Sequence, residues 1–295
     1  MKYIKPDFYD TFVCKADKCA HTCCKGWEID IDDETLSLYD SLGGEIGGEI
    51  RANIKRGEPA SFVLTEDERC PFLGEDGLCR LILKLGDGAL CDICAEHPRF
   101  YNELYDRTEM GLGLCCEEAV RLLLSGSGRL GFVGEDDGES APQDERDAEL
   151  LSKRRRISDL VFSDAPLSTA LEQACAVCEV KMPEGRISEW AEFFSKLERM
   201  DESWGERLSA LSGCGLTVSE ALQTKDISLK RLAEYLIYRH FANYGESTLP
   251  FVIISAALIS AMNGAFGDLA EIVRQFSSEI EYSDENIEKI LERFT

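Results

Sequence analysis

The sequence has little histidine and little positive charge. Histidine occurs 3 times in 295 residues, and 32 Lys and Arg residues face 56 Asp and Glu residues, which gives a formal net charge of −24 at pH 7. The negative electrostatic field of such a protein repels the phosphates of nucleic acids, so we do not expect nucleic-acid binding. It would attract a cationic partner, although solubility alone also accounts for it.

A long hydrophobic run is also missing. Residues 1–8 contain no apolar stretch or cleavage site, so we expect no signal peptide. The longest apolar run, residues 249–262, is shorter than the roughly 20 residues that a membrane helix needs. We therefore expect a cytoplasmic protein without a membrane span. In that compartment clustered cysteines are more often metal ligands or catalytic residues than disulfides, and the odd count of 13 agrees.

The common nucleotide-binding and hydrolase motifs are absent from the sequence. There is no Walker loop, no Gly-x-Gly-x-x-Gly after a predicted strand and no convincing Ser-His-Asp arrangement. A conventional Rossmann cofactor site is therefore not supported.

Cysteine is the residue that the sequence has in excess. Ten of the 13 cysteines lie between residues 14 and 116. Only Cys91–Cys94 and Cys175–Cys178 have the Cys-x-x-Cys spacing of zinc sites, and the second pair falls on one face of a predicted helix, which favours the core. The irregular spacing of the others suits an iron–sulfur cluster assembled from separate loops, with zinc left open. We assign no role to Cys214.

The order of patterns predicts a mainly α fold with a small Cys-rich α+β N-terminal module. We expect a strand over 27–32, a helix capped by Asp32 or Asp33, a further helix over 49–55, a strand over 61–65, a hairpin around residues 106–107 and a helix over 117–124. Helical spacing then predicts seven helices, at 150–162, 167–180, 187–200, 229–243, 250–262, 269–276 and 286–294.

Composition suggests three segments. Residues 1–125 would form the metal- or cluster-binding module, and residues 126–147, rich in Gly, Glu, Asp and Ser, would form a linker or mobile loop. Residues 148–295 would form a helical bundle.

The N-terminal 120 residues resemble the bacterial flagellin lysine-N-methylase family, itself akin to Cys-rich zinc- or iron-chelating proteins. The resemblance rests on Pro6-Asp7-Phe8, on Cys14-x4-Cys19-x3-Cys23-Cys24-x-Gly26-Trp27, on Cys70-Pro71-Phe72-Leu73 with Gly77-Leu78-Cys79, and on Cys94 with Pro98-Arg99. It implies methyl transfer from S-adenosylmethionine to lysine side chains of flagellin or another lysine-rich protein, and a 4Fe–4S cluster. Cys116 matches a family cysteine, whereas Cys91 and Cys115 stand where none is expected.

We predict that four cysteines hold the metal, drawn from a set of eight: Cys14, Cys19, Cys23, Cys24, Cys70, Cys79, Cys94 and Cys116. Eight thiols exceed the needs of one cluster, which favours a fully ligated, mainly structural cluster over one with an open iron. His97, close behind Cys94, could be a further ligand or could orient one.

Methyl transfer needs a neutral lysine amine in line with the sulfonium methyl group, so positioning and deprotonation are the tasks of the protein. Tyr235, Tyr238, Glu117 and Glu118 are the catalytic candidates. The alternative is a metal-binding structural or sensing module without catalysis, which docks a cationic protein partner.

Overall fold

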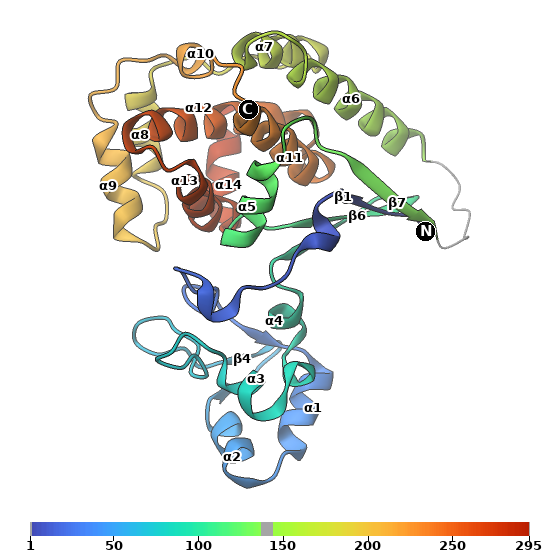
Figure 1. Ribbon diagram of the computed structural model, residues 1–295, viewed down its shortest axis with the longest axis vertical. Coiled ribbons are helices and arrows are strands. Elements are labelled where there is room, and N and C mark those ends of the chain that lie inside the picture. Colours follow the sequence, from blue (N-terminus) through green and yellow to red (C-terminus); the bar gives the residue numbers. More distant parts are fainter. Residues whose placement is uncertain (1, 137–143, 295) are drawn as a thin grey trace. The chain divides into compact units, whose positions relative to one another are not determined.

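A computed structural model describes residues 2–136 and 144–294 of the chain (Figure 1). The chain forms two compact units, one of Val13–Arg99 and one of Met1–Phe12 with Phe100–Thr295. These bounds differ from the expected division at residues 125 and 147. Leu112, Leu114 and Leu123 pack into the same hydrophobic core as the later helices, and their burial ties residues 100–125 to the larger unit.

The Val13–Arg99 unit combines a small sheet with short helices. Its antiparallel strands β2 (Asp30–Ile31), β4 (Ala60–Phe62) and β3 (Ile54–Lys55) lie in the order β2-β4-β3. Its helices are α1 (Asp33–Ser41), α2 (Gly44–Ala52), α3 (Arg80–Leu85) and α4 (Asp92–Glu96). As predicted, Asp32 caps α1, where its carboxylate accepts a hydrogen bond from the Thr35 amide at 2.8 Å.

The strands of this unit are shorter than predicted, and helix α2 begins earlier. The helix expected over 49–55 begins at Gly44 and includes Gly47 and Gly48. A Cβ on Gly47 would lie 2.2 Å from the Leu42 carbonyl oxygen, so only glycine permits this close approach of the two chain segments. Burial of Ile50 in the core of the unit offsets the low helix propensity of the glycines in α2.

The larger unit contains a four-stranded sheet in the order β5-β6-β1-β7. Its strands are β5 (Arg99–Glu103), β6 (Arg107–Leu112), β1 (Lys2–Pro6) and β7 (Phe132–Asp136). Strand β1 pairs in parallel with β6 and antiparallel with β7, and the hairpin at residues 106–107 is confirmed. Part of the predicted linker is therefore strand β7, and residues 137–143 of that linker lie outside the described residues.

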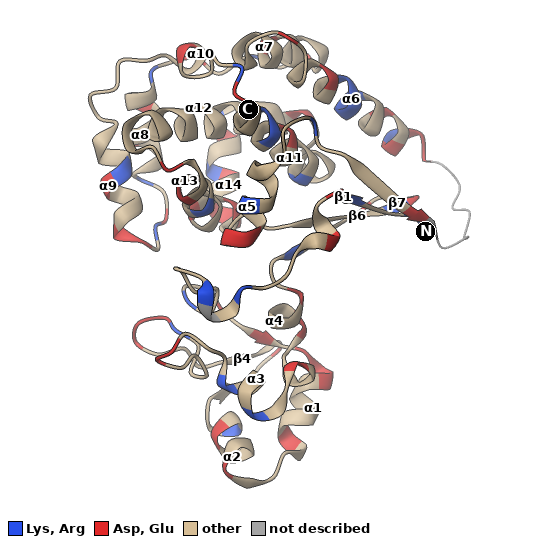
Figure 2. Ribbon diagram, viewed as in Figure 1, with Lys and Arg blue, Asp and Glu red and all other residues tan. Residues whose placement is uncertain are grey.

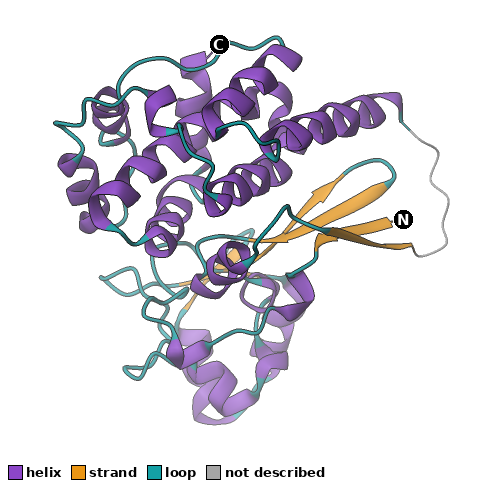
Figure 3. Ribbon diagram, turned by 45° about the horizontal axis from the view of Figure 1, so that its top comes forward, coloured by secondary structure: helices purple, strands orange, loops and turns teal. Residues whose placement is uncertain are grey.

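Helices make up most of this unit, so the prediction of a mainly helical chain is confirmed (Figure 3). In chain order they are α5 (Glu117–Ser125), α6 (Glu145–Val161), α7 (Leu167–Val177), α8 (Ile187–Phe194), α9 (Glu202–Ala210), α10 (Val218–Ala221), α11 (Ile227–Tyr244), α12 (Thr248–Phe266), α13 (Leu269–Phe276) and α14 (Asp284–Leu291). Each predicted range contains a helix. Helices α9 and α10 escaped prediction because each buries only a few apolar side chains.

Helix α12 is the centre of the helical unit. It is apolar on all sides and contacts α7, α8, α10, α11, α13 and α14. The segment Ile227–Phe266, which includes α11 and α12, is long and apolar enough to cross a membrane by length and composition. However, 72% of its most apolar window is buried inside the fold, and the core helix of a soluble protein meets the same criterion.

Gly111 in β6 provides a test of how tightly the sheet packs against α11. A Cβ there would lie 2.2 Å from the Phe100 ring and 2.9 Å from the Tyr235 hydroxyl oxygen. We expect Gly111→Ala to lower the free energy of unfolding by about 1–3 kcal/mol in urea titrations because the core is overpacked. Gly264→Ala, in α12 with open space around it, is the control and should be neutral or stabilise by about 0.5–1 kcal/mol. Equal effects of the two substitutions would contradict this packing.

Candidate functional site

Five cysteines gather in the core of the Val13–Arg99 unit. Cys70 and Cys91 are buried there, and Cys24, Cys79 and Cys94 pack against the same core while partly exposed. They come from separate segments of the chain: a loop before β2, the loop between β4 and α3, the start of α3 and the start and middle of α4. Such a gathering from separate loops was expected of a cluster site.

A tight turn between Cys70 and Cys79 brings these two cysteines together. Leu73 and Cys79 form an antiparallel bridge, and the Gly74 amide donates to the Leu78 carbonyl at 2.9 Å. Gly77 has a φ of +78°, which glycine adopts at little cost. The Cys70 amide in turn donates to the Cys24 carbonyl at 2.9 Å, which joins the first segment to this turn.

The thiols influence one another electrostatically. A hydrogen bond donated by the Cys94 thiol lowers the pKa of Cys91 and raises that of Cys94. Burial raises the pKa of Cys70 to about 11, with Cys79 and Cys91 adding to the effect. Cys24 accepts a hydrogen bond from Cys23, which lowers the pKa of Cys24. A cation at the centre of this group would favour the thiolate forms and reverse the raised values.

The five cysteines are suitable ligands for a metal because thiolates bind zinc and iron. Their side chains are not arranged as in a complete metal site. Across residues 2–136 and 144–294, no group of three or more His, Cys, Asp or Glu side chains meets the geometry of a metal site. Four sulfur ligands suit either zinc or an iron–sulfur cluster.

The structure brings together only part of the predicted ligand set. Cys24, Cys70, Cys79 and Cys94 of that set are in the gathering, and Cys91, which we had set aside, belongs to it too. Its Cys-x-x-Cys spacing with Cys94 was the sequence signal that could have found it. Outside the gathering, Cys14 and Cys23 are exposed, Cys19 is half-buried, and Cys116 precedes α5 in the other unit.

His97 lies beside an aromatic ring of the same unit. Its imidazole stacks on Trp27 with 5.8 Å between ring centroids, and burial lowers the pKa of His97 to about 4. The Trp27 indole donates to the Cys23 carbonyl at 2.7 Å. A neutral imidazole at neutral pH is the form that could act as a ligand, so the proposal for His97 stays open.

Two catalytic candidates, Tyr235 and Tyr238, fasten α11 to the sheet. The Tyr235 hydroxyl donates to the Leu112 carbonyl at 2.7 Å and accepts from the Leu112 amide at 2.6 Å. The Tyr238 hydroxyl lies 2.9 Å from the Ile4 carbonyl oxygen and 3.0 Å from that of Met110. Burial raises the pKa of both phenols. These contacts give both residues a structural role, and their catalytic role stays a prediction.

The two carboxylate candidates lie at the start of α5, where Figure 2 shows acidic residues. Glu118 is buried and forms an ion pair with Arg121 at 2.5 Å. Glu117 is half-buried and interacts electrostatically with Arg274. Glu117 is therefore the more accessible carboxylate for a substrate.

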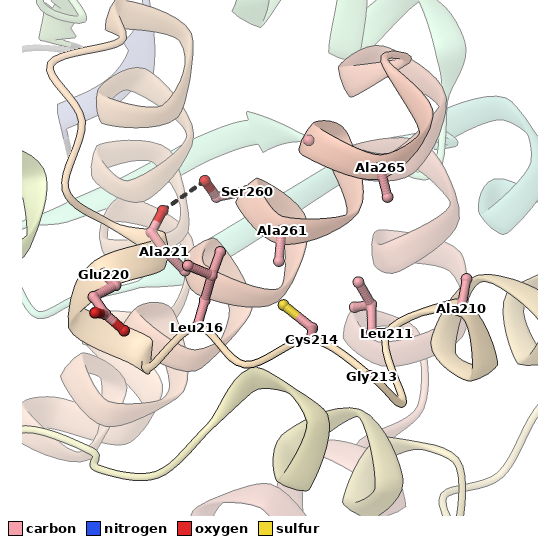
Figure 4. A pocket seen from close by; sticks show the side chains of 11 residues that line it. Ala210, Leu211, Gly213, Cys214, Leu216, Glu220, Ala221, Ser260, Ala261 and Ala265 are labelled. Carbon is pink, nitrogen blue, oxygen red and sulfur yellow. Dashed lines mark hydrogen bonds between the residues drawn. The ribbon is translucent and has the colours of Figure 1, made fainter.

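A surface hollow lies between α9, α10 and α12 of the helical unit (Figure 4). Its volume is about 640 Å³, and small or apolar residues such as Ala261, Leu211 and Leu216 line it together with Cys214. Glu220 at its edge is engaged in capping α10, where it accepts from the Thr217 amide at 2.8 Å. The hollow therefore presents few polar groups for a ligand.

Comparison with curated proteins finds relatives named for lysine methylation and flagellar biosynthesis. Over 128 residues, 41% of this chain, the sequence is 29% identical to proteins named lysine-N-methylase from Salmonella typhimurium and Salmonella choleraesuis. It is 29% identical over a stretch of the same length to the flagellar biosynthetic protein FliU of Salmonella muenchen. The resemblance to the flagellin lysine-N-methylase family is thereby confirmed.

The extent of the match differs between these relatives. The matched stretch covers 76% of the FliU protein but only 32% of each lysine-N-methylase. The chain therefore spans about a third of the length of the curated lysine-N-methylases that it matches. No protein-family model and no solved structure matches the chain.

The contacts of Tyr235 predict a loss of stability when its hydroxyl is removed. We expect Tyr235→Phe to lower the free energy of unfolding by about 1–3 kcal/mol, because the buried amide and carbonyl of Leu112 would lose their partner. Urea titration monitored by circular dichroism measures this. Tyr105→Phe, at an exposed position on the same unit, is the control and should change little. An unchanged midpoint for Tyr235→Phe would contradict the structural role.

Proposed function

We propose that this relative of the lysine-N-methylases is a protein-lysine N-methyltransferase that uses S-adenosylmethionine. The similarity to proteins of that name is the observation that carries the proposal. The name FliU of the third relative supports flagellin, or another flagellar protein, as the substrate. The chain would work in the reducing cytoplasm, where its cysteines remain available as ligands.

The charge of the chain supports a lysine-rich substrate. A formal net charge of −24 attracts a cationic protein and raises the rate of encounter at low salt. The same field favours the charged form of a bound lysine, which cannot attack a methyl group. A carboxylate or another base must therefore take a proton from the ammonium group before transfer.

Among the four catalytic candidates, Glu117 fits this task best. Tyr235, Tyr238 and Glu118 are buried, so a substrate amine has less access to them than to Glu117. Glu117, at the first position of α5, is half-buried and would accept the proton of the substrate amine. S-adenosylmethionine supplies the methyl group when bound. Holding the amine in line with that group is the remaining task of the protein.

The five gathered cysteines would hold an iron–sulfur cluster, with zinc as the alternative metal. A unit of this size with so many loops has a small hydrophobic core, and metal binding would add folding free energy to it. Five thiols can saturate four ligand positions and leave one spare. We therefore propose a fully ligated cluster with a mainly structural role.

Transfer of a labelled methyl group tests the enzymatic proposal. Anaerobically purified protein, flagellin and methyl-labelled S-adenosylmethionine should yield label on flagellin lysines, and flagellin with acetylated lysines should remain unlabelled. Glu117→Gln should lower the rate about 100-fold or more because the base is lost, whereas Glu206→Gln, exposed on α9, should not. No label in flagellin with folded, metal-loaded protein would contradict the proposal.

Removal of one gathered cysteine tests the metal site. We expect Cys91→Ser to abolish or strongly reduce bound iron or zinc in anaerobically purified protein, as measured by elemental analysis. Cys214→Ser, a cysteine of the helical unit, should leave the metal content unchanged. Stoichiometric zinc without iron would reject the cluster but keep the site. Equal metal content in Cys91→Ser and the unchanged protein would reject the site.

The alternative function is a metal-binding structural or sensing module that docks a cationic protein partner. The concentration of thiols in one small unit and the strong negative charge favour it as much as they favour the enzyme. The two are distinguished by the fate of flagellin in the labelling experiment. Salt-sensitive binding of flagellin without label would favour the docking module.

A further inference from the structure

Arg239 of α11 lies in a buried polar cluster that the proposed catalysis does not use. Its guanidinium carbon lies 4.9 Å from the centre of the Phe100 ring and 5.1 Å from that of Tyr282. These contacts place aromatic rings against the guanidinium group. Arg239 Nε lies 3.4 Å from Glu281 Oε1. Glu281 closes the π-helical turn η5 (Ser277–Glu281), an irregular geometry that is frequent at functional sites.

One atom on each side of this ion pair has no hydrogen-bond partner. Glu281 Oε1 contacts both Arg239 and, at 2.8 Å, His240 Nε2, while Glu281 Oε2 and Arg239 Nη1 are buried and unpaired among the residues that the structure describes. The carboxylate is fully buried, and Arg239 nearly so. A buried polar atom without a hydrogen-bond partner costs free energy even where its group is part of an ion pair, so these two atoms could accept and donate to a ligand.

Arg231 and Arg154 of the same unit have no buried nitrogen without a partner. Arg231 donates to the Leu123 and Gly128 carbonyls at 2.7 Å each, and Arg154 forms two hydrogen bonds with Glu109. Arg239 differs because its Nη1 donor and the Oε2 acceptor of its ion-pair partner Glu281 both lack a hydrogen-bond partner. A ligand that satisfies both must present an anionic acceptor and a cationic donor a few ångströms apart. The ammonium and carboxylate groups of an α-amino acid have this arrangement.

We propose that Arg239 and Glu281 bind the α-amino-carboxylate head group of a small ligand, with the carboxylate on Arg239 Nη1 and the ammonium on Glu281 Oε2. Two sources share this chemistry: a free amino acid, or the methionine end of the methyl donor, the second of which rests on the proposed function. Tyr282 is 44% exposed and covers the guanidinium, so its ring is the group that would move on ligand entry.

Isothermal titration with defined probes tests this site. S-adenosylhomocysteine carries the head group, 5′-methylthioadenosine lacks it, and L-methionine and L-lysine represent the free amino acids. We expect Arg239→Gln and Arg239→Lys to weaken binding of head-group ligands about tenfold to hundredfold and to leave any binding of methylthioadenosine unchanged. Arg231→Gln is the matched control, since Arg231 lies on the same helix and is also buried but donates to main-chain carbonyls.

The outcomes separate this inference from the proposed function. Arg239-dependent binding of S-adenosylhomocysteine or of a free amino acid supports the site, even if flagellin remains unlabelled. Unchanged binding in both Arg239 variants, with normal label transfer, overturns the site and leaves the methyltransferase intact. Absence of binding by all head-group probes to the unchanged protein also overturns it. Thermal unfolding followed by circular dichroism verifies that each variant is folded.

Discussion

The need to satisfy buried polar groups on α11 governs the architecture of the larger unit. This helix carries both hydroxyl and charged side chains into the interior, and each requires a partner there. Tyr235 and Tyr238 bind main-chain groups of the sheet, and Glu234 accepts from the Leu130 amide at 3.0 Å and from Arg129 at 3.1 Å. These bonds position the sheet and the loop before β7 on the helix. They also explain why residues 100–136 fold with the helical unit.

The Val13–Arg99 unit is stabilised differently from the larger unit. Its hydrophobic core is small: the rings of Tyr39, Phe62 and Phe72 pack against one another there, beside aliphatic side chains such as Ile50 and Leu81. The five gathered cysteines take the place that further apolar side chains would occupy in a larger domain. When a metal binds, these thiols would become thiolate ligands, and the metal–sulfur bonds would add free energy of folding that the weak thiol hydrogen bonds do not supply.

The sequence predicted the helices well because their signals are local. Asp32 as a cap, the apolar period of α13 and the turn at residues 106–107 can each be recognised within a few residues. The division into units and the thiol set could not be predicted in this way. The inclusion of Cys91 and the separation of Cys116 depend on long-range contacts, and so do the hydrogen bonds that engage Tyr235 and Tyr238. The pairing of Arg239 with Glu281, 42 residues later, has no local signal either.

Mapping thiol alkylation by mass spectrometry tests most directly whether the gathered cysteines hold one metal group. In anaerobically purified protein, Cys24, Cys79 and Cys94 should resist alkylation although they are partly exposed, and should become reactive together when a chelator removes the metal. Cys14, which is exposed, should react equally in both states. Unrelated rates for the three cysteines, unaffected by the chelator, would contradict the account.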